Sequence, residues 1–165
     1  MGNKIVKKII FFLLIFFSLN YSILAQNIQK VKISDVIRII DTTQTPLIVN
    51  FWASWCKPCV EELPWFEKMA EENKSYNVKL LLVSLDFADD YPKALTAFVK
   101  KKGYKSEVVW LNETDANYFC NKIDMAWEGN IPVSLFINNK KQYRIFIANQ
   151  VPEPRLKLEF QKLLE

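Results

Sequence analysis

Hydrophobic residues in this chain form short apolar runs that alternate with amphipathic segments. Runs rich in β-branched residues indicate strands, whereas apolar residues spaced three and four apart indicate helices. Strands are predicted at 46–49, 78–86, 107–111, 133–137 and 142–147, and helices at 34–40, 57–70, 92–102, 116–122 and 151–163. This order predicts an α/β domain over residues 26–165, with a central mixed β-sheet flanked by helices on both faces.

Several details of these elements can be predicted as well. The run at 78–86 is apolar on both faces, which is typical of an interior strand. The last two strands, joined by four polar residues, predict an antiparallel hairpin. Ser34 or Asp35 can cap the first helix, and Thr114 or Asp115 can cap the helix at 116–122.

Residues 1–25 differ in composition from the rest and predict a targeting segment. Three lysines form a positive head before an unbroken apolar run at residues 9–17, and the tail is mixed. This pattern is typical of a signal peptide that is removed on export. The alternative is an uncleaved membrane anchor, with residues 9–24 as a tether, although the run is short for a membrane span. We therefore expect an exported, periplasmic or extracytoplasmic protein, either soluble after cleavage or membrane-anchored.

Composition narrows the range of functions. The 165 residues are half hydrophobic and 24% charged, which is ordinary for one globular domain. The net charge is +4, but three of the basic residues lie in the targeting segment, so the remainder is nearly neutral. This balance does not favour a nucleic-acid partner.

The candidate chemistry lies where the strand at 46–49 gives way to a helix, in the sequence Trp52-Ala53-Ser54-Trp55-Cys56-Lys57-Pro58-Cys59. Two intervening residues let the cysteines close a disulfide. The unpaired N–H groups of a helix N-terminus stabilise a thiolate and lower the pKa of the first cysteine. Proline suits the first helical turn. We predict that Cys56 is the exposed nucleophile and Cys59 the shielded, resolving sulfur.

Other uses of this cysteine pair are weaker. A zinc site needs two more ligands, but the chain has no histidine and one further cysteine, Cys120, so no metal is expected. Haem attachment needs a histidine where Val60 stands. A structural disulfide is the remaining alternative, although so short a loop gains little from closure. Cys120 is expected to be buried and inert, with a regulatory disulfide as the alternative.

These residues resemble a known family. Trp52–Cys59 is similar to the active-site signature of thioredoxin-like proteins, and Val60-Glu61-Glu62-Leu63-Pro64 narrows the resemblance to the TlpA/ResA-type branch of exported thiol–disulfide oxidoreductases. A second family element is Gly129-Asn130-Ile131-Pro132-Val133-Ser134-Leu135-Phe136-Ile137. The resemblance covers most of the chain after about residue 30. It implies a thioredoxin fold and a protein-disulfide reductase that needs no diffusible cofactor.

The resemblance assigns Glu62 to the position of an active-site glutamate. It lies about one helical turn beyond Cys59, and partial burial would raise its pKa and suit it to accept a proton from that cysteine. The alternative is a surface glutamate in the first turn of a helix. Asn50 stands where thioredoxins proper carry a proton-accepting aspartate, so that role is vacant here.

The resemblance also marks Ile131 and Pro132 as a cis-proline element beside the cysteines. Ile131 would pair with the backbone of an extended substrate and form part of a hydrophobic platform. An ordinary proline at the start of a strand is the alternative. Trp55 is expected to contact a peptide substrate through its flat ring, and Trp127 to wall the same groove.

Lys57 and Pro58 are expected to tune the redox potential, through charge near the thiolate and through backbone stiffness. The reaction predicted is thiol–disulfide exchange through Cys56 and Cys59. The resemblance implies a reductant of disulfide-containing exported proteins, recharged by a membrane-embedded electron donor, although the direction of electron flow cannot be read from the sequence. The alternatives are a non-catalytic interaction module and a peroxiredoxin-type peroxidase, which would need threonine at the position of Ala53.

Overall fold

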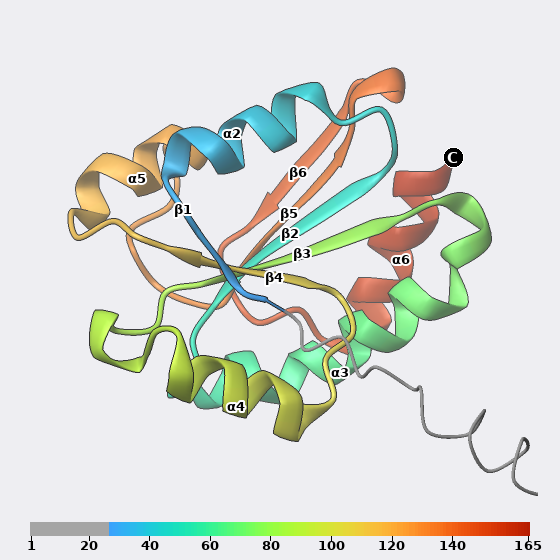
Figure 1. The fold of residues 1–165 in the computed structure, drawn as a ribbon. Coiled ribbons are helices and arrows are strands. Elements are labelled where there is room, and N and C mark those ends of the chain that lie inside the picture. Colours follow the sequence, from blue (N-terminus) through green and yellow to red (C-terminus); the bar gives the residue numbers. More distant parts are fainter. Residues whose placement is uncertain (1–26) are drawn as a thin grey trace, which may run out of the picture.

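The computed structural model describes residues 27–165, which fold around one six-stranded sheet (Figure 1). The strands are β1 (Gln29–Val31), β2 (Leu47–Trp52), β3 (Lys79–Ser84), β4 (Glu107–Leu111), β5 (Val133–Asn138) and β6 (Tyr143–Ile147). The helices are α2 (Ile33–Thr42), α3 (Lys57–Glu72), α4 (Lys93–Lys102), α5 (Ala116–Ile123) and α6 (Glu153–Leu164). Three short 3-10 helices are η1 (Lys74–Tyr76), η2 (Ala88–Asp90) and η3 (Asn139–Lys141). The predicted segment 1–25 lies outside the described residues.

The sheet is mixed, with the strand order β1-β4-β3-β2-β5-β6. Strands β1, β4, β3 and β2 are parallel to one another, β5 is antiparallel to β2, and β6 is antiparallel to β5. The predicted hairpin and interior strand are therefore confirmed. Strand β1 was not predicted, because a three-residue edge strand paired only with β4 carries almost no hydrophobic pattern.

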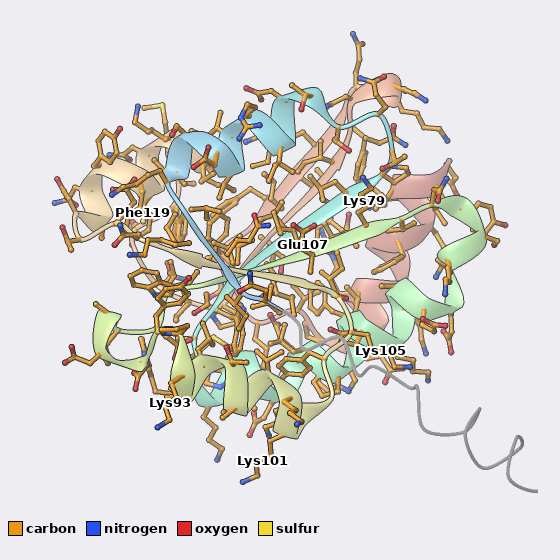
Figure 2. All side chains as sticks on the ribbon, viewed as in Figure 1. Lys79, Lys93, Lys101, Lys105, Glu107 and Phe119 are labelled. Atoms are coloured by element: carbon orange, nitrogen blue, oxygen red, sulfur yellow. A yellow bond between two sulfur atoms is a disulfide. The ribbon has the colours of Figure 1, made fainter. Side chains whose placement is uncertain are left out.

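Helices cover both faces of the sheet, as the element order predicts (Figure 1). Apolar residues of α3, α4 and α6 form one buried cluster with one face of the strands, whereas residues of α2 and α5 form another with the opposite face. Figure 2 shows Phe119 on α5, within the second cluster, while Lys93 and Lys101 extend from α4 away from the sheet. Central strands are consequently apolar on both faces, which explains why their sequences are continuous apolar runs.

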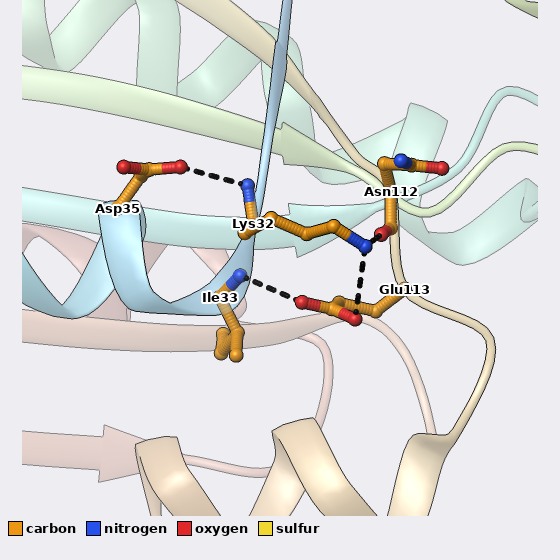
Figure 3. Close-up of polar contacts among 5 residues, drawn as sticks. All are labelled: Lys32, Ile33, Asp35, Asn112 and Glu113. Atoms are coloured by element: carbon orange, nitrogen blue, oxygen red, sulfur yellow. Dashed lines mark hydrogen bonds and ion pairs between the residues drawn. The ribbon is translucent and has the colours of Figure 1, made fainter.

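The start of α2 is fixed by the segment that follows β4 (Figure 3). The backbone N–H of Ile33 donates to the carboxylate of Glu113 at 3.2 Å, and the Lys32 ammonium lies 3.4 Å from the same carboxylate. Asp35 accepts the backbone N–H of Lys32 at 3.0 Å. The predicted caps Ser34 and Asp35 are thus wrong, since Lys32 is the N-cap and Asp35 is the third helical residue. A remote carboxylate satisfies the helix end instead.

Of the two residues predicted to cap α5, Asp115 is the one that does so. Asp115 precedes α5 and its side chain accepts the backbone N–H of Tyr118 at 3.2 Å.

Within residues 27–165, none of the helices has the length and apolar character needed to cross a membrane.

The core of the sheet should dominate stability. Leu82 is fully buried in β3 beside β2 and β4, so Leu82→Ala is expected to lower the free energy of unfolding by about 2–5 kcal/mol. Leu158 on α6 is 42% exposed, and the matched Leu158→Ala change should stay within about 0.5 kcal/mol. Urea denaturation followed by circular dichroism measures both, and equal losses would contradict this account of the core.

Candidate functional site

The cysteine pair lies where β2 ends and α3 begins. Cys56 is the N-cap residue of α3, and its backbone N–H donates to the carbonyl of Ala53 at 3.1 Å, closing a tight turn. Pro58 lies in the first turn of the helix, where its missing N–H costs nothing. The first cysteine is therefore presented at the positive end of a sixteen-residue helix.

Cys56 and Cys59 form a disulfide, with an S–S distance of 1.98 Å and a Cα–Cα distance of 5.3 Å. The Sγ of Cys56 also accepts the backbone N–H of Cys59 at 3.3 Å. In the reduced protein, this N–H and the helix end would stabilise a thiolate on Cys56. The geometry places that sulfur where it can hold negative charge.

Cys56 is more exposed than Cys59, as predicted, but its exposed fraction is smaller than expected. Cys59 is fully buried, whereas Cys56 is 6% exposed. The expectation of an exposed Cys56 is therefore too strong. The loop before β5 lies against this residue, with the carbonyl oxygen of Ile131 3.8 Å from the Cys56 Sγ, so only a small part of it reaches solvent.

That loop carries the second sequence element. The Ile131–Pro132 peptide bond is cis, as the resemblance implies. This loop leads from α5 into the start of β5, and the disulfide follows the end of β2. Because β2 and β5 are antiparallel neighbours, the loop and the disulfide lie at the same end of the sheet. Trp127, predicted to wall the groove, is 2% exposed and packs on Phe51, with ring centroids 4.6 Å apart. That expectation is wrong, because the ring belongs to the core.

Trp55 is 54% exposed immediately before Cys56. Its ring stacks on Phe87, which is 64% exposed, with centroids 5.6 Å apart and planes inclined by 17°. Two large aromatic faces thus stand in solvent beside the disulfide, although such surface is normally buried. Phe87 was missed, since its position after a strand gives no sign of its neighbour.

Asp86, which precedes Phe87, holds the loop that leads to the disulfide. Its carboxyl oxygens accept the backbone N–H of Ser54 at 3.0 and 3.2 Å, and the hydroxyl of Ser54 bonds to the same group. The hydroxyl of Ser84 donates to it at 2.6 Å. Asp86 is 4% exposed. The sequence offered one signal for this positioning role, a lone carboxylate at the end of an interior strand.

Glu62 is fully buried on α3, three residues beyond Cys59. One oxygen accepts the side-chain N–H of Asn50 at 2.8 Å, and the other accepts the backbone N–H of Val151 at 2.7 Å. Burial raises the pKa of Glu62 from 4.5 to about 7, while the two hydrogen bonds oppose part of that shift. The group can therefore take up or release a proton near neutral pH.

Asn50 has a role that sequence reasoning missed. Its Nδ2 donates both to Glu62 and, at 2.9 Å, to the hydroxyl of Ser134 on β5. Asn50 and Ser134 face each other across the β2–β5 pair, and both are fully buried. The available signal was a single polar residue inside each of two apolar strands.

The residues between the cysteines have different surroundings. Lys57 is exposed and forms a surface ion pair with Glu61, at 3.8 Å. The carbonyl of Pro58 accepts the side-chain N–H of Gln150 at 3.0 Å, which ties the loop before α6 to the helix start. Glu61 is a surface residue, whereas Glu62 is not, so the two adjacent acids have separate environments.

Cys120 lies away from the disulfide on α5. It is a free thiol, 2% exposed, and burial raises its pKa to about 11, which makes it unreactive at neutral pH. The described part of the chain has no cluster of three or more histidine, cysteine or acidic side chains that could hold a metal ion.

One family model and several curated proteins match this chain. The profile of the AhpC/TSA family matches residues 16–142. Thiol-disulfide oxidoreductase ResA of Oceanobacillus iheyensis is 28% identical over 91 residues, covering 50% of this chain and 47% of that protein. Sporulation thiol-disulfide oxidoreductase A of Bacillus subtilis is 38% identical over 53 residues, covering 32% of each protein. The chain thus spans about half, or less, of the curated relatives it matches.

Solved structures establish the fold. A thioredoxin-related protein from Neisseria meningitidis serogroup B superposes with a TM-score of 0.62 at 23% identity, covering 75% of this chain and 89% of that one. At this identity the likeness bears on the fold alone. The predicted thioredoxin fold, a mixed sheet with helices on both faces, is confirmed.

Burial of Glu62 predicts a pH dependence of stability. Between pH 4.5, its ordinary pKa, and about 7, the unfolded chain loses this proton while the folded protein keeps it. The folded state binds more protons there, so the free energy of unfolding should fall as pH rises through this window, by up to about 3 kcal/mol. Urea titrations of wild type and Glu62→Gln at several pH values measure the difference, and a flat difference would contradict the burial of an ionisable group.

The Asp86 contacts predict a second effect. Asp86→Asn leaves the Ser54 N–H and hydroxyl with a poorer acceptor, and we expect a loss of about 1–3 kcal/mol in unfolding free energy. Alkylation of the reduced Cys56 should also slow, because its loop is less well held. Asp89→Asn, an exposed acid in η2, is the matched control. Equal behaviour of the two variants would exclude a positioning role for Asp86.

Proposed function

The chain belongs to the AhpC/TSA family, and within that family we propose that it is a thiol–disulfide oxidoreductase that acts through Cys56 and Cys59. The observation that carries this proposal is the disulfide at the start of α3, beside the cis-proline loop and one helical turn from a buried glutamate. A purely structural disulfide would need none of these neighbours. Relatives named as thiol-disulfide oxidoreductases support the same reaction.

The reaction runs through two exchanges. The thiolate of reduced Cys56 attacks one sulfur of a substrate disulfide, which forms a mixed disulfide and releases the other substrate sulfur as a thiolate. Cys59 then loses its proton and attacks the Sγ of Cys56. That step forms the Cys56–Cys59 bond and releases the second substrate thiolate. Two electrons pass to the substrate, and the released thiolates are protonated.

Glu62 serves as the proton acceptor for Cys59 in the second exchange. Its pKa of about 7 leaves it partly ionised at neutral pH, which suits a group that both takes and returns a proton. No charged side chain among the described residues forms an ion pair with Glu62, so its proton affinity is set by burial and by the contacts of Asn50 and Val151.

Substrate recognition is assigned to the surface around the Cys56 sulfur. The backbone of Ile131, next to Pro132, lies close enough to that sulfur to pair with an extended segment of the substrate. Trp55 provides a flat apolar surface on the exposed side. Lys57 and Pro58 tune the potential through a positive charge near the thiolate and through stiffness of the first turn.

The direction of transfer is assigned as reduction of exported proteins. Residues 1–25 support export, either as a signal peptide or as an anchor with residues 9–24 in the membrane. An oxidising compartment would drive the dithiol to the disulfide, so a membrane-embedded electron donor is needed to restore it. A midpoint potential nearer to about −270 mV than to about −120 mV, measured in glutathione buffers, would support a reductant.

Two other functions are distinguished from this one, the first by the residue at position 53 and the second by experiment. A peroxidase of the peroxiredoxin type would need a hydroxyl at position 53, but Ala53 is fully buried and contributes only its backbone carbonyl to the turn. A non-catalytic interaction module would keep the fold without turnover. Both alternatives make distinct predictions in the assay below.

Insulin reduction with dithiothreitol as electron source tests the proposal. We expect Cys56→Ser to fall to the rate of dithiothreitol alone, because the nucleophile is lost. Cys59→Ser, reduced and then separated from dithiothreitol, should trap the mixed disulfide between Cys56 and insulin, which mass spectrometry detects. Cys120→Ser is the matched control and should retain full activity, since that thiol is buried in the cluster on the opposite face of the sheet from the two reacting cysteines.

Wild type and Cys56→Ser with equal rates, while both are folded, would refute the oxidoreductase and favour the interaction module. Faster consumption of hydrogen peroxide than of insulin disulfides would favour the peroxidase instead.

A further inference from the structure

The side chain of Asn50 has one satisfied end and one unsatisfied end. Its Nδ2 makes two hydrogen bonds, to Glu62 Oε1 at 2.8 Å and to Ser134 Oγ at 2.9 Å. Its Oδ1 is buried and has no hydrogen-bond partner among residues 27–165. An unpaired oxygen on a fully buried amide is costly, and groups of this kind call for an explanation.

Glu62 faces these contacts as a carboxylate. Both of its oxygens accept hydrogen bonds, one from Asn50 and the other from the backbone of Val151. Two donors aimed at the two oxygens favour the ionised form and give no acceptor to the O–H of the acid. A proton that Glu62 carries on the side of either contact displaces that donor, and neither donor can accept the O–H of the acid. The Val151 N–H is fixed in the backbone, whereas the amide of Asn50 can turn.

The charged side chains near Glu62 are engaged elsewhere, so none of them accepts the O–H of the protonated acid. On α3, the neighbours of Glu62 are the two cysteines and the surface pair Lys57–Glu61. Strands β2 and β5 contribute the neutral side chains of Asn50 and Ser134. On α6, Arg155 and Lys162 lie against Glu159, which also bonds to the hydroxyl of Tyr143 on β6.

We propose that Asn50 is a positioning residue with two orientations, one holding Glu62 as a carboxylate through Nδ2 and the other accepting the proton of the acid through Oδ1. A half turn of the amide exchanges the two ends. Oδ1 then accepts from both the Glu62 acid and the Ser134 hydroxyl, whose proton is free to reorient. Nδ2 then takes the place without a partner, as Oδ1 does in the first orientation. The amide turns back when Glu62 is deprotonated, because a carboxylate has no proton to donate to Oδ1.

In the thiol–disulfide reaction this arrangement would make Glu62 a reversible acceptor. The Nδ2 contact prepares a carboxylate before Cys59 loses its proton, and the turned amide receives the acid afterwards. This consequence for turnover rests on the proposed function, but the two orientations do not, since they concern only the proton on Glu62. The role can therefore be tested in the oxidised protein without any substrate.

Titration of the Glu62 carboxyl carbon by NMR, in the full chain with its disulfide intact, tests the first orientation. Glu62→Gln identifies the signal. Asn50→Ala should raise the midpoint by about one pH unit, a tenfold rise in proton affinity, because the carboxylate loses a donor. Ser134→Ala is the matched control. It removes the other partner of the amide but leaves the bond to Glu62, so it should move the midpoint far less.

Asn50→Asp is nearly isosteric and keeps the test open if the alanine variant does not fold. It would put a second carboxyl in place of the donor 2.8 Å from Glu62, and the two should titrate as a coupled pair in two steps. An unchanged, single-step midpoint in a folded Asn50 variant would overturn the inference.

Nuclear Overhauser contacts test the second orientation. Above the midpoint, the Asn50 Hδ2 protons should show contacts with the Hβ protons of Ser134, and below it these contacts should weaken as Oδ1 replaces Nδ2. Equal intensities on both sides would refute the half turn.

The pH profile of insulin reduction tests whether the proton on Glu62 controls turnover. It should shift upward in Asn50→Ala by the amount seen for Glu62. If Cys56→Ser instead reduces insulin as well as wild type, the proposed function fails while the titration still decides the role of Asn50.

Discussion

Strand β2 organises the molecule because it is buried on both faces and hydrogen-bonded along both edges. All six of its residues are buried, with β3 on one side and β5 on the other. The segments of the site are attached to these three strands. The disulfide follows β2, the Asp86–Phe87 pair follows β3, and the cis-proline loop precedes β5. Because the strands are fixed relative to one another, three segments distant in sequence meet at one end of the sheet.

A buried carboxylate is the energetic cost of this arrangement. Glu62 loses its hydration inside the interface between α3 and the sheet, and two hydrogen bonds only partly compensate. The result is a proton affinity near neutrality, which a surface glutamate would not have. A stability cost at a functional group is common where activity requires an unfavourable environment. Asn50 and Ser134 belong to the same balance, since they are polar residues placed in otherwise apolar strands.

The exposed side of the site follows a different principle. Consecutive residues Asp86 and Phe87 contact consecutive residues Ser54 and Trp55, one pair through hydrogen bonds and the other through stacked rings. The polar contact holds the turn before Cys56 inside the protein, while the aromatic pair remains in solvent. Rigid support beneath and apolar surface above are what an exchange reaction with a polypeptide disulfide would use.

The sequence by itself determined the fold class, the order of most elements, the cysteine pair and the candidate acid Glu62, because periodicity and motif spacing are local properties. Only the tertiary structure decided that Cys56 is nearly buried, that Trp127 belongs to the core, and that Lys32 rather than Ser34 caps α2. It also brought Asp86 to Ser54 and Asn50 to Glu62 and Ser134. Those contacts join residues from different strands and helices, and their partners depend on the pairing of β2 with β3 and β5. The local hydrophobic pattern does not specify which strands pair, so the polar contacts of the site could be identified only in the folded structure.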